Sequence, residues 1–254
     1  MKMWAIFLLS LIISNSVMTK ENRGDTREQV EPFGYLYGLG IAFNQEIYKG
    51  YNFRLIPLPI LGYRGENFRV LGPFVSYDVI QFSNLDVRVQ ASPRFQRFDY
   101  SDSYIFENMA ERKFSMDAGI SLTYEKNNWK VGLSSMFDVL GRSKGFEAKT
   151  NLSKVFSTGP IFFEPSISIS YLDDNHVDYY YGVKETEINN HTYLYQGNST
   201  LNKTIGFSVA TPILLGGFTQ LALTYTWYGS SITNSPLVES KANLNARLMF
   251  SKFF

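Results

Sequence analysis

One stretch of the sequence has the spacing of a catalytic serine motif. Residues 141–145 read Gly-Arg-Ser-Lys-Gly, which fits the G-x-S-x-G pattern of a nucleophile elbow around Ser143. That motif needs a strand before it, a helix after it and a histidine to accept the hydroxyl proton. Strand-like segments flank it on both sides here, and the two histidines, His176 and His191, lie in a later polar loop. We therefore interpret residues 141–145 as a turn rich in glycine and serine and predict no catalytic residues.

A second stretch has side chains that could bind a metal ion. Residues 173–178 read DDNHVD and gather three carboxylates, and hard cations such as Ca²⁺ favour clustered oxygen ligands. The spacing matches no defined calcium loop, so we expect a solvated surface loop. Gly38 and Gly40 alone are too little for a dinucleotide fingerprint, and no helix is predicted after them. The sequence thus predicts neither metal-binding nor cofactor-binding residues.

The composition is unusual for a soluble protein and excludes several functions. The chain has 254 residues, and its 24 Lys+Arg against 23 Asp+Glu give a formal charge of +1, which would not attract nucleic acid. The absence of cysteine excludes disulfides, thiolate zinc sites and a lipid anchor on cysteine. Aromatic residues make up 16% of the chain and charged residues 19%, against about 25% charged in typical soluble domains. A chain rich in aromatics and poor in charge is typical of the wall of a membrane barrel.

The N-terminus has the pattern of an export signal. Lys2 supplies a positive start, residues 3–13 are apolar except for Ser10, and small residues follow. We predict a signal peptide over residues 1–16, a flexible polar segment over 17–32 and an outer-membrane barrel over 33–254. An uncleaved anchor helix is the alternative, but the apolar run is shorter than the roughly 20 residues that a bilayer span needs.

Beyond residue 33 apolar and polar residues alternate, which predicts β-strands with one apolar face and one polar face. The predicted segments are about 9–12 residues long, which exceeds the usual 5–6 of soluble strands and matches a tilted membrane strand. A soluble sandwich would also alternate, but aromatic strand ends and small polar side chains on the inner face favour a barrel. The clearest examples are residues 84–92, 115–124, 163–171, 201–209 and 220–227.

The number of segments bears on how the barrel closes. Eleven segments are predicted, whereas single-chain bacterial barrels have an even number of strands. Either one segment near the N-terminus does not span or a strand is missed, so we predict an all-β, antiparallel transmembrane barrel of twelve strands, with ten as the alternative. Tight turns and long polar loops alternate between the segments, as expected when short turns face the periplasm. The predicted strands are residues 35–43, 53–63, 68–77, 84–97, 114–125, 128–138, 146–156, 161–171, 201–211, 218–228 and 241–253.

Several charged side chains are predicted to face the lumen. They would either tune an open pore or cross-link a filled interior as ion pairs, and the sequence does not distinguish the two. These residues are Arg54, Arg69, Asp86, Arg88, Asp117, Lys130 and Glu164.

A set of short segments runs in order through the predicted barrel. It comprises YKGY at 48–51, PLP at 57–59 with Tyr63, NMAER at 108–112, Asp138 with GRSKG at 141–145, YYGV at 180–183 and SPLV at 235–238. Together these segments resemble the MltA-interacting protein/OmpV (MipA/OmpV) family of Gram-negative outer-membrane proteins, over about residues 33–254. The terminal Phe254 also resembles the signal read by the barrel-assembly machinery. The chain departs from the family at Lys252 and in the Asn- and Tyr-rich loop 184–200.

The resemblance implies a non-enzymatic barrel in the outer membrane of a Gram-negative bacterium. Family members are described as scaffolds that join a murein lytic transglycosylase to a murein synthase, and others as porin-like proteins or surface antigens. We accordingly expect a scaffold for the peptidoglycan machinery, in contact with outer-membrane lipid and not with nucleic acid. A small solute pore is the alternative. An outer-membrane lipase would need a histidine beside a lipid-facing serine at the rim, where the sequence places neither His176 nor His191.

The prolines and glycines of these segments have a structural interpretation. Pro57 and Pro59 are expected to break strand pairing near an edge. Gly50, Gly145 and Gly182 are expected to permit tight loop geometry.

Overall fold

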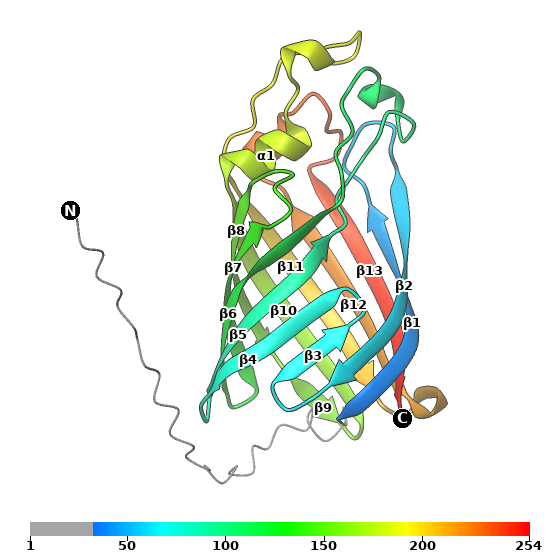
Figure 1. The fold of residues 1–254 in the computed structure, drawn as a ribbon, viewed down its shortest axis with the longest axis vertical. Coiled ribbons are helices and arrows are strands. Elements are labelled where there is room, and N and C mark those ends of the chain that lie inside the picture. The colour runs from blue at the N-terminus through cyan, green and yellow to red at the C-terminus, as the bar shows by residue number, and fades with distance from the viewer. Residues whose placement is uncertain (1–32) are drawn as a thin grey trace, which may run out of the picture.

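The computed structural model describes residues 33–254, which form a closed antiparallel β-barrel (Figure 1). The signal peptide predicted over residues 1–16 and the polar segment predicted over 17–32 lie outside the described residues. Among the described residues, no helix is both long enough and apolar enough to cross a membrane. The helices are short and lie in the connections between strands.

The strands fall where the alternation of the sequence predicts them. Because a strand turns successive side chains to opposite faces, each segment can place apolar groups outside and polar groups inside. The strands are β1 (Gly34–Gln45), β2 (Phe53–Arg64), β3 (Phe68–Leu71), β4 (Phe74–Gln81), β5 (Leu85–Arg94), β6 (Ser115–Lys126), β7 (Trp129–Asp138), β8 (Phe146–Lys154), β9 (Phe156–Thr158), β10 (Ile161–Leu172), β11 (Thr200–Thr211), β12 (Phe218–Trp227) and β13 (Ala242–Phe253).

Strand pairing closes the sheet into a barrel of twelve strands. Strands that follow one another in the chain pair antiparallel, and β13 pairs with β1 from Leu36 opposite Phe253 to Asn44 opposite Asn245. The named strands β8 and β9 both pair with β10 and are one strand interrupted at Val155. The predicted all-β barrel of twelve strands is therefore confirmed.

The strand missing from the sequence prediction lies within residues 68–77. The prediction of a single strand over these residues is wrong. This stretch is a hairpin in which β3 and β4 pair across a turn at Gly72 and Pro73. Gly72 has a positive φ of 57°, which glycine adopts without strain. Because the hairpin turn spans only two residues, apolar and polar residues keep alternating through it, which conceals the reversal of the chain.

The hairpin is much shorter than the strand before it. β3 pairs with β2 only over Gly62–Arg64, so the part of β2 that contains Pro57 and Pro59 has no sheet partner on this side. The prolines thus lie at a strand edge, as the sequence predicts, while β2 pairs with β1 at both of these positions. Proline has no N–H to give to a sheet and is found at unpaired strand edges for that reason.

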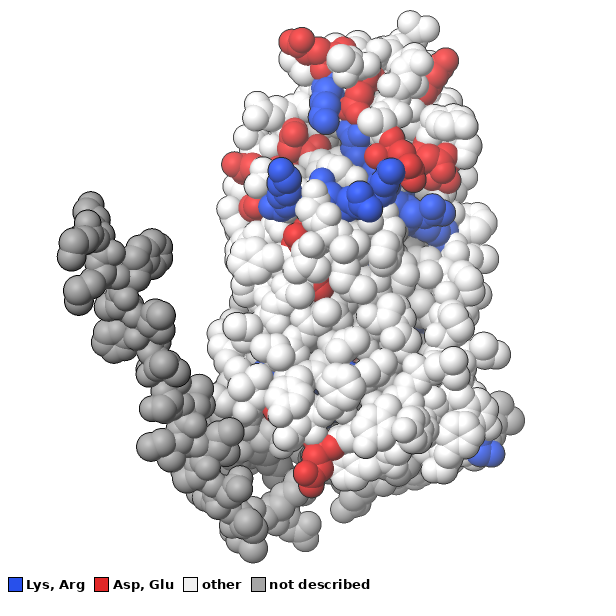
Figure 2. Space-filling model, in the orientation of Figure 1, with Lys and Arg blue, Asp and Glu red and all other residues white. Residues whose placement is uncertain are grey.

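The outer face of the barrel is apolar and the charges lie mainly at one end. Leu39 and Leu61 are each 73% exposed, as side chains that face lipid should be when the surrounding bilayer is left out. Figure 2 shows Lys, Arg, Asp and Glu gathered around the upper end, with few on the wall below. The wall has the apolar surface that membrane-spanning strands require.

The two ends differ in the length of their connections. One end has short turns, and the other has five longer connections at residues 46–52, 95–114, 139–145, 173–199 and 228–241. By the rule for bacterial barrels, the short turns face the periplasm and the long loops face outward. The outer loops contain η1 (Tyr104–Phe106), α1 (Asp174–Tyr181), η2 (Glu185–Glu187) and α2 (Ser230–Thr233), and one periplasmic connection contains η3 (Leu214–Gly216).

Candidate functional site

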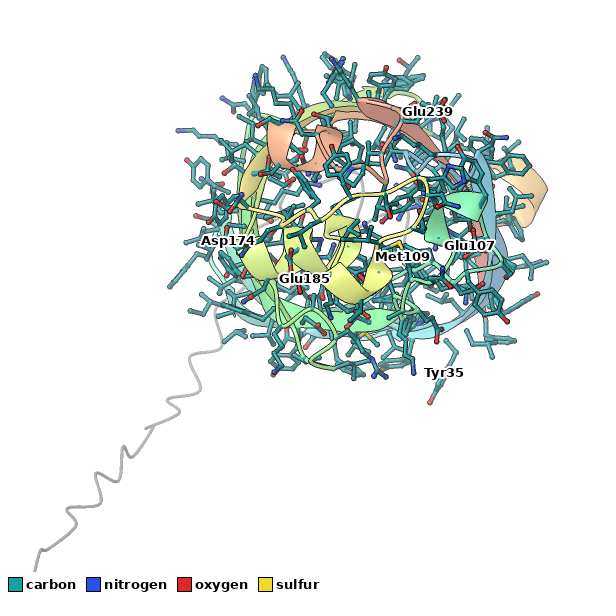
Figure 3. All side chains as sticks on the ribbon, turned by 90° about the horizontal axis from the view of Figure 1, so that it is seen from above. Tyr35, Glu107, Met109, Asp174, Glu185 and Glu239 are labelled. Atoms are coloured by element: carbon teal, nitrogen blue, oxygen red, sulfur yellow. The ribbon has the colours of Figure 1, made fainter. Side chains whose placement is uncertain are left out.

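Four of the outer loops fold inward and pack together over the mouth of the barrel. Seen from above, the segments that carry Met109, Asp174 and Glu185 lie across the ring of strands (Figure 3). We call this assembly the plug, and it consists of residues 46–52, 95–114, 173–199 and 228–241. Figure 1 shows α1 lying at the rim of the same end.

The centre of the plug is a small hydrophobic core. The rings of Phe98 and Phe106 stack with centroids 3.9 Å apart, and Tyr48 lies edge-on to both at 5.3 Å. Burial of large aromatic side chains is a main source of packing energy, so this core holds the loops in one arrangement. Its members are Ile47, Tyr48, Phe98, Ile105, Phe106, Met109, Leu172, Val177, Tyr180, Tyr181, Val183, Ile232, Leu237 and Val238.

A buried ion pair fastens two of the plug loops. The two terminal nitrogens of Arg112 donate to the two carboxylate oxygens of Glu187, both at 2.8 Å, and each side chain is 3% exposed. Arg112 also donates to the carbonyls of Tyr179 at 2.6 Å and Ala110 at 2.7 Å. Burial alone would raise the pKa of Glu187, but the hydrogen bonds and charge of Arg112 outweigh it and hold that pKa below its usual range.

Tyrosine hydroxyls connect three loops of the plug. Tyr48 donates to the carbonyl of Tyr180 at 3.2 Å, and the Gln96 amide donates to the hydroxyls of Tyr48 at 3.2 Å and Tyr181 at 2.9 Å. Burial raises the pKa of both tyrosines far above the ordinary value. Both hydroxyls are therefore neutral, and they serve the plug as hydrogen-bonding groups.

The two histidines lie in different surroundings. His176 in α1 is 2% exposed, and its ring packs 5.1 Å from that of Tyr180. Burial, and secondarily the charge of Arg94, lowers the pKa of His176 well below its ordinary value, so the ring is neutral at pH 7. His191 lies on the outer surface with its ring against Tyr104 at 5.1 Å.

The serine of the nucleophile-elbow pattern braces its own loop. Asp138 accepts hydrogen bonds from the backbone and hydroxyl of Ser143 at 2.6 and 3.1 Å and from the backbone of Lys144 at 3.0 Å. Ser143 Oγ in turn accepts from the backbone N–H of Gly145 at 3.0 Å. A Cβ added at Gly145 would lie 2.7 Å from the Cβ of His176, so this glycine allows the loop to pack on α1. These contacts support the interpretation of residues 141–145 as a turn.

The acidic stretch 173–178 holds α1 in place. Asp173 accepts from the backbone N–H groups of His176 and Phe146, both at 2.9 Å, which makes it the N-cap of α1. Asp178 accepts from the backbone of Gly197 at 2.9 Å. Within residues 33–254, no three His, Asp or Glu side chains come together in a group that could hold a metal ion. The carboxylates of this stretch thus serve the backbone of the plug.

A cavity of about 480 Å³ lies in the lumen beneath the plug. Its ceiling includes Tyr48, His176 and Tyr181 from the plug. Its walls come from β1, β2, β5, β8 and β10 to β13 and are mostly Asn, Thr, Ser and charged side chains. The cavity is a polar chamber closed from above by the plug.

Two ion-pair groups cross the cavity walls. Arg54 Nε donates to Glu46 at 2.8 Å. Arg94 donates through Nε to Asp117 and through a terminal nitrogen to Glu147, both at 2.7 Å. In a low-dielectric lumen such pairs hold neighbouring strands and loops together.

Two cations in the same cavity have no such partner. Lys149 of β8 and Arg247 of β13 line the cavity, and within the described part of the chain neither makes an ion pair or a side-chain hydrogen bond. Arg247 stands between Ala42 and Ala222 of the adjacent strands. These two side chains give the chamber uncompensated positive charge.

Most of the charged residues predicted to face the lumen are cross-linked there. Arg69 and Arg88 both pair with the carboxylate of Asp78, at 3.0 and 2.5 Å, and Asp78 is almost fully buried. Such ion pairs are one of the two alternatives that the sequence left open, and the cavity shows that they leave part of the lumen unfilled. The contacts are Arg69 and Arg88 with Asp78, Arg54 with Glu46, Arg94 with Asp117, Lys130 with Glu125, and Ser153 with Glu164.

Comparison with known proteins identifies the family. The sequence model described as MltA-interacting protein MipA matches residues 37–254. The chain belongs to the MipA/OmpV family. Its relatives include the outer membrane protein YiaT of Escherichia coli K12, which is 28% identical over 59% of this chain and 62% of its own length. OmpV of Vibrio cholerae is 25% identical over 56% of each chain.

A third relative carries the name of the family. The MltA-interacting protein of Escherichia coli K12 is 23% identical over 80% of this chain and 83% of its own length. The chain spans only about three fifths of the length of YiaT, the first relative compared. The MipA/OmpV chain described here is thus an outer-membrane β-barrel, homologous to outer-membrane proteins of Gram-negative bacteria.

Four of the six segments that carry the family resemblance lie in the plug. The backbone of Lys49 donates to the carbonyl of Leu237 at 2.9 Å, which joins YKGY to SPLV. Ser235 Oγ donates to the carbonyl of Tyr181 at 2.6 Å, which joins SPLV to YYGV. NMAER supplies Arg112 of the buried ion pair. In this MipA/OmpV protein, segments that lie far apart in the sequence are therefore parts of one structure.

Sequence reasoning missed several residues of the site. Glu46, Arg94 and Glu147 were not singled out, nor were the unpaired Lys149 and Arg247. Each lies on the polar face of a strand or at its end. The alternation of polar and apolar residues could therefore have indicated that these side chains face the lumen. Which of these side chains pair across the lumen depends on the tilt and register of the strands, which composition and periodicity do not determine.

Proposed function

We propose that this protein anchors and organises peptidoglycan machinery at the outer membrane, with a murein lytic transglycosylase and a murein synthase as partners. The name of the MltA-interacting relative, 23% identical over most of both chains, supports this role. The observation that favours it over a free pore is the plug, whose packed aromatic core and buried ion pair close the mouth of the barrel. A closed barrel can hold a partner in place without letting solutes pass.

The periplasmic end offers a surface for such a partner. Residues 212–217 form the longest periplasmic connection among the described residues, and they carry η3. Ile213 and Leu214 are 57% and 52% exposed there. Apolar side chains that project from a turn are the groups that a periplasmic protein would bury on docking.

Site-specific photo-crosslinking in cells tests this role. A benzophenone amino acid in place of Ile213 is expected to form adducts with a murein hydrolase or synthase. The matched control replaces Tyr193, which is 59% exposed on the outer loops and out of reach of periplasmic enzymes. Equal adducts at both positions, or adducts with lipid alone at position 213, would reject the scaffold role. Ile213→Ser with Leu214→Ser should lower co-purification several-fold and leave the heat-dependent gel shift of the barrel unchanged.

A narrow solute pathway is the second candidate, and the cavity with its unpaired Lys149 and Arg247 is the observation that favours it. A chamber with excess positive charge would prefer anions. Planar-bilayer recordings decide between the two functions. A steady anion-selective conductance would support the pathway, and a folded protein that stays silent would reject it.

A further inference from the structure

The strand pairing of the barrel wall is interrupted between β2 and β5, and we call this interruption the lateral opening. β2 has sheet pairing on its β3 side only over Gly62–Arg64, and β5 has pairing on its β4 side only up to Ala91. The β3–β4 hairpin ends below this level, with its tip beside Gly62 of β2 (Figure 1). Residues 53–60 of β2 and 92–94 of β5 thus lie on strand edges that have no sheet partner on this side.

Two positions of the β2 edge have no backbone N–H. The carbonyl of Leu61 accepts from the backbone N–H of Gly72 at 2.9 Å, so odd-numbered residues of β2 direct their backbone groups toward the opening. Pro57 and Pro59 are two of these residues. An N–H left unpaired in lipid costs several kcal/mol, and proline has none. The prolines make this edge tolerable in an apolar environment.

The β5 edge shows the same adaptation. Leu85 and Phe82 exchange backbone hydrogen bonds at 2.8 and 3.3 Å, so odd-numbered residues of β5 direct their backbone groups toward β4 and, above it, toward the opening. Pro93 is the odd-numbered residue on the unpaired stretch. Both edges of the opening therefore carry proline at positions whose nitrogen faces the gap.

From Leu55 to Leu61, below Arg54, the side chains of β2 are apolar on both faces of the strand. Leu55 and Leu61 are 53% and 73% exposed on the lipid side. On the lumen side, Ile56 lines the cavity, and Leu58 and Ile60 are buried. A strand that is apolar on both faces fits a place where hydrocarbon is present on both sides.

Phe95 stands where the opening meets the cavity. It lines the cavity, and its ring lies 6.5 Å from that of Phe74 at the hairpin tip and 6.0 Å from that of Phe114 on the outer surface. Above it, Arg54 donates across the opening to the carbonyl of Phe95 at 2.6 Å. Ile56 and Phe95, which border the interrupted pairing, thus line the same chamber as Lys149 and Arg247.

We propose that the lateral opening is a binding site for a free single-chain anionic amphiphile of the fatty-acid class. The acyl chain lies between the proline-bearing edges of β2 and β5, and the carboxylate lies in the cavity with Lys149 and Arg247. The charges are complementary, because these two cations have no acidic partner. A cavity of about 480 Å³ has the size of a site for one small molecule. The proposal does not depend on the scaffold role.

Photo-labelling with a 16-carbon fatty acid that carries a diazirine near the end of its chain tests the site. The folded protein in detergent is irradiated, and the labelled residues are located by mass spectrometry. We expect labels on residues 53–61, Phe74 and Phe95. Arg247→Gln with Lys149→Gln should lower labelling about tenfold or more, since charge-assisted hydrogen bonds are lost. Lys252→Gln, at an exposed position of β13, is the matched control and should have no effect.

A second pair of variants tests the passage itself. Ile56→Trp fills the lumen side of the opening and should abolish labelling, whereas Leu221→Trp on the paired wall should not. Folding of each variant is checked by its heat-dependent gel shift. If Ile56→Trp does not fold, the charge variants and the competitors described below still decide the outcome.

Competition identifies the source of the amphiphile. Unlabelled 16-carbon fatty acid should displace the probe, and hexadecanol and a diacyl phospholipid should not. Equal displacement by hexadecanol would overturn the role of the two cations. Stronger displacement by the diacyl lipid, or labels spread evenly around the outer face, would overturn the site as a whole.

Discussion

The buried ion pair makes the stability of the plug testable with one substitution. Arg112→Ala leaves the Glu187 carboxylate without its partner at 3% exposure and removes the donor from the carbonyls of Tyr179 and Ala110. Removing one side of a buried pair costs about 3–5 kcal/mol, because a buried charge is left uncompensated. At about 1.4 kcal/mol per factor of ten, the open fraction of the plug should rise about 100- to 4,000-fold.

Amide hydrogen exchange measures this opening directly. The N–H of Arg112 is bonded to the carbonyl of Phe98 at 2.9 Å, and that of Val183 to the carbonyl of Tyr195 at 2.8 Å. Both amides should exchange faster in the Arg112→Ala variant by the factor given above, because local opening limits their exchange. Amides in the paired strands should keep their wild-type rates. In planar bilayers, the same variant should show bursts of conductance.

A neighbouring pair provides the control. Lys113 and Glu111 lie 4.0 Å apart, and both side chains are about half exposed. Lys113→Ala should therefore change the free energy of plug opening by no more than about 1 kcal/mol, and amide exchange in the plug should change little. Arg112→Met combined with Glu187→Leu should recover much of the protection, since apolar side chains of similar size can replace a buried pair. Wild-type exchange rates in Arg112→Ala would refute the reasoning that this pair holds the plug closed.

Three further outcomes follow from buried groups and close contacts. Burial lowers the pKa of His176 in the folded plug below 6.5. The neutral ring therefore stabilises the plug fully above pH 6.5, and this stabilisation is lost as the pH falls toward the pKa of His176 in the folded protein. Plug exchange should therefore accelerate below about pH 6.5, and His176→Gln but not His191→Gln should flatten this dependence. Gly119→Ala places a Cβ 1.8 Å from the carbonyl oxygen of Ser135 and should cost about 1–3 kcal/mol in urea unfolding. Asp78→Asn leaves two lumen arginines without their shared carboxylate and should lower stability by about 3–5 kcal/mol in the same assay.

The barrel could be predicted because its signal is local. A period of two, maintained over segments of membrane length, follows from the requirement that one face meets lipid and the other the lumen. The reversal at Gly72 and Pro73 was missed because a two-residue turn hardly disturbs that period. The Gly-Pro dipeptide, which marks turns, was the available signal.

The plug was beyond prediction because it is held by contacts between distant loops. Residues 173–178 and 141–145 resembled chemistry when read one at a time, yet their polar groups serve the backbone of α1 and its neighbouring loop. Arg112 carries no mark in the sequence that assigns it to Glu187, 75 residues away. The resemblance of scattered segments to one family indicated that they matter, and only the fold shows that they meet.

On the proposed scaffold role, the plug and the periplasmic surface serve different purposes at the two ends of the barrel. The family segments at 48–51, 108–112, 180–183 and 235–238 all lie in the plug, and a partner that acts on peptidoglycan approaches from the opposite end. These segments therefore account for a closed mouth and give no information on partner choice. Relatives at 23–28% identity can share the closed barrel and still differ in what they hold. On the proposed scaffold role, the choice of partner belongs to the periplasmic turns, and in this chain η3 offers the apolar side chains for it.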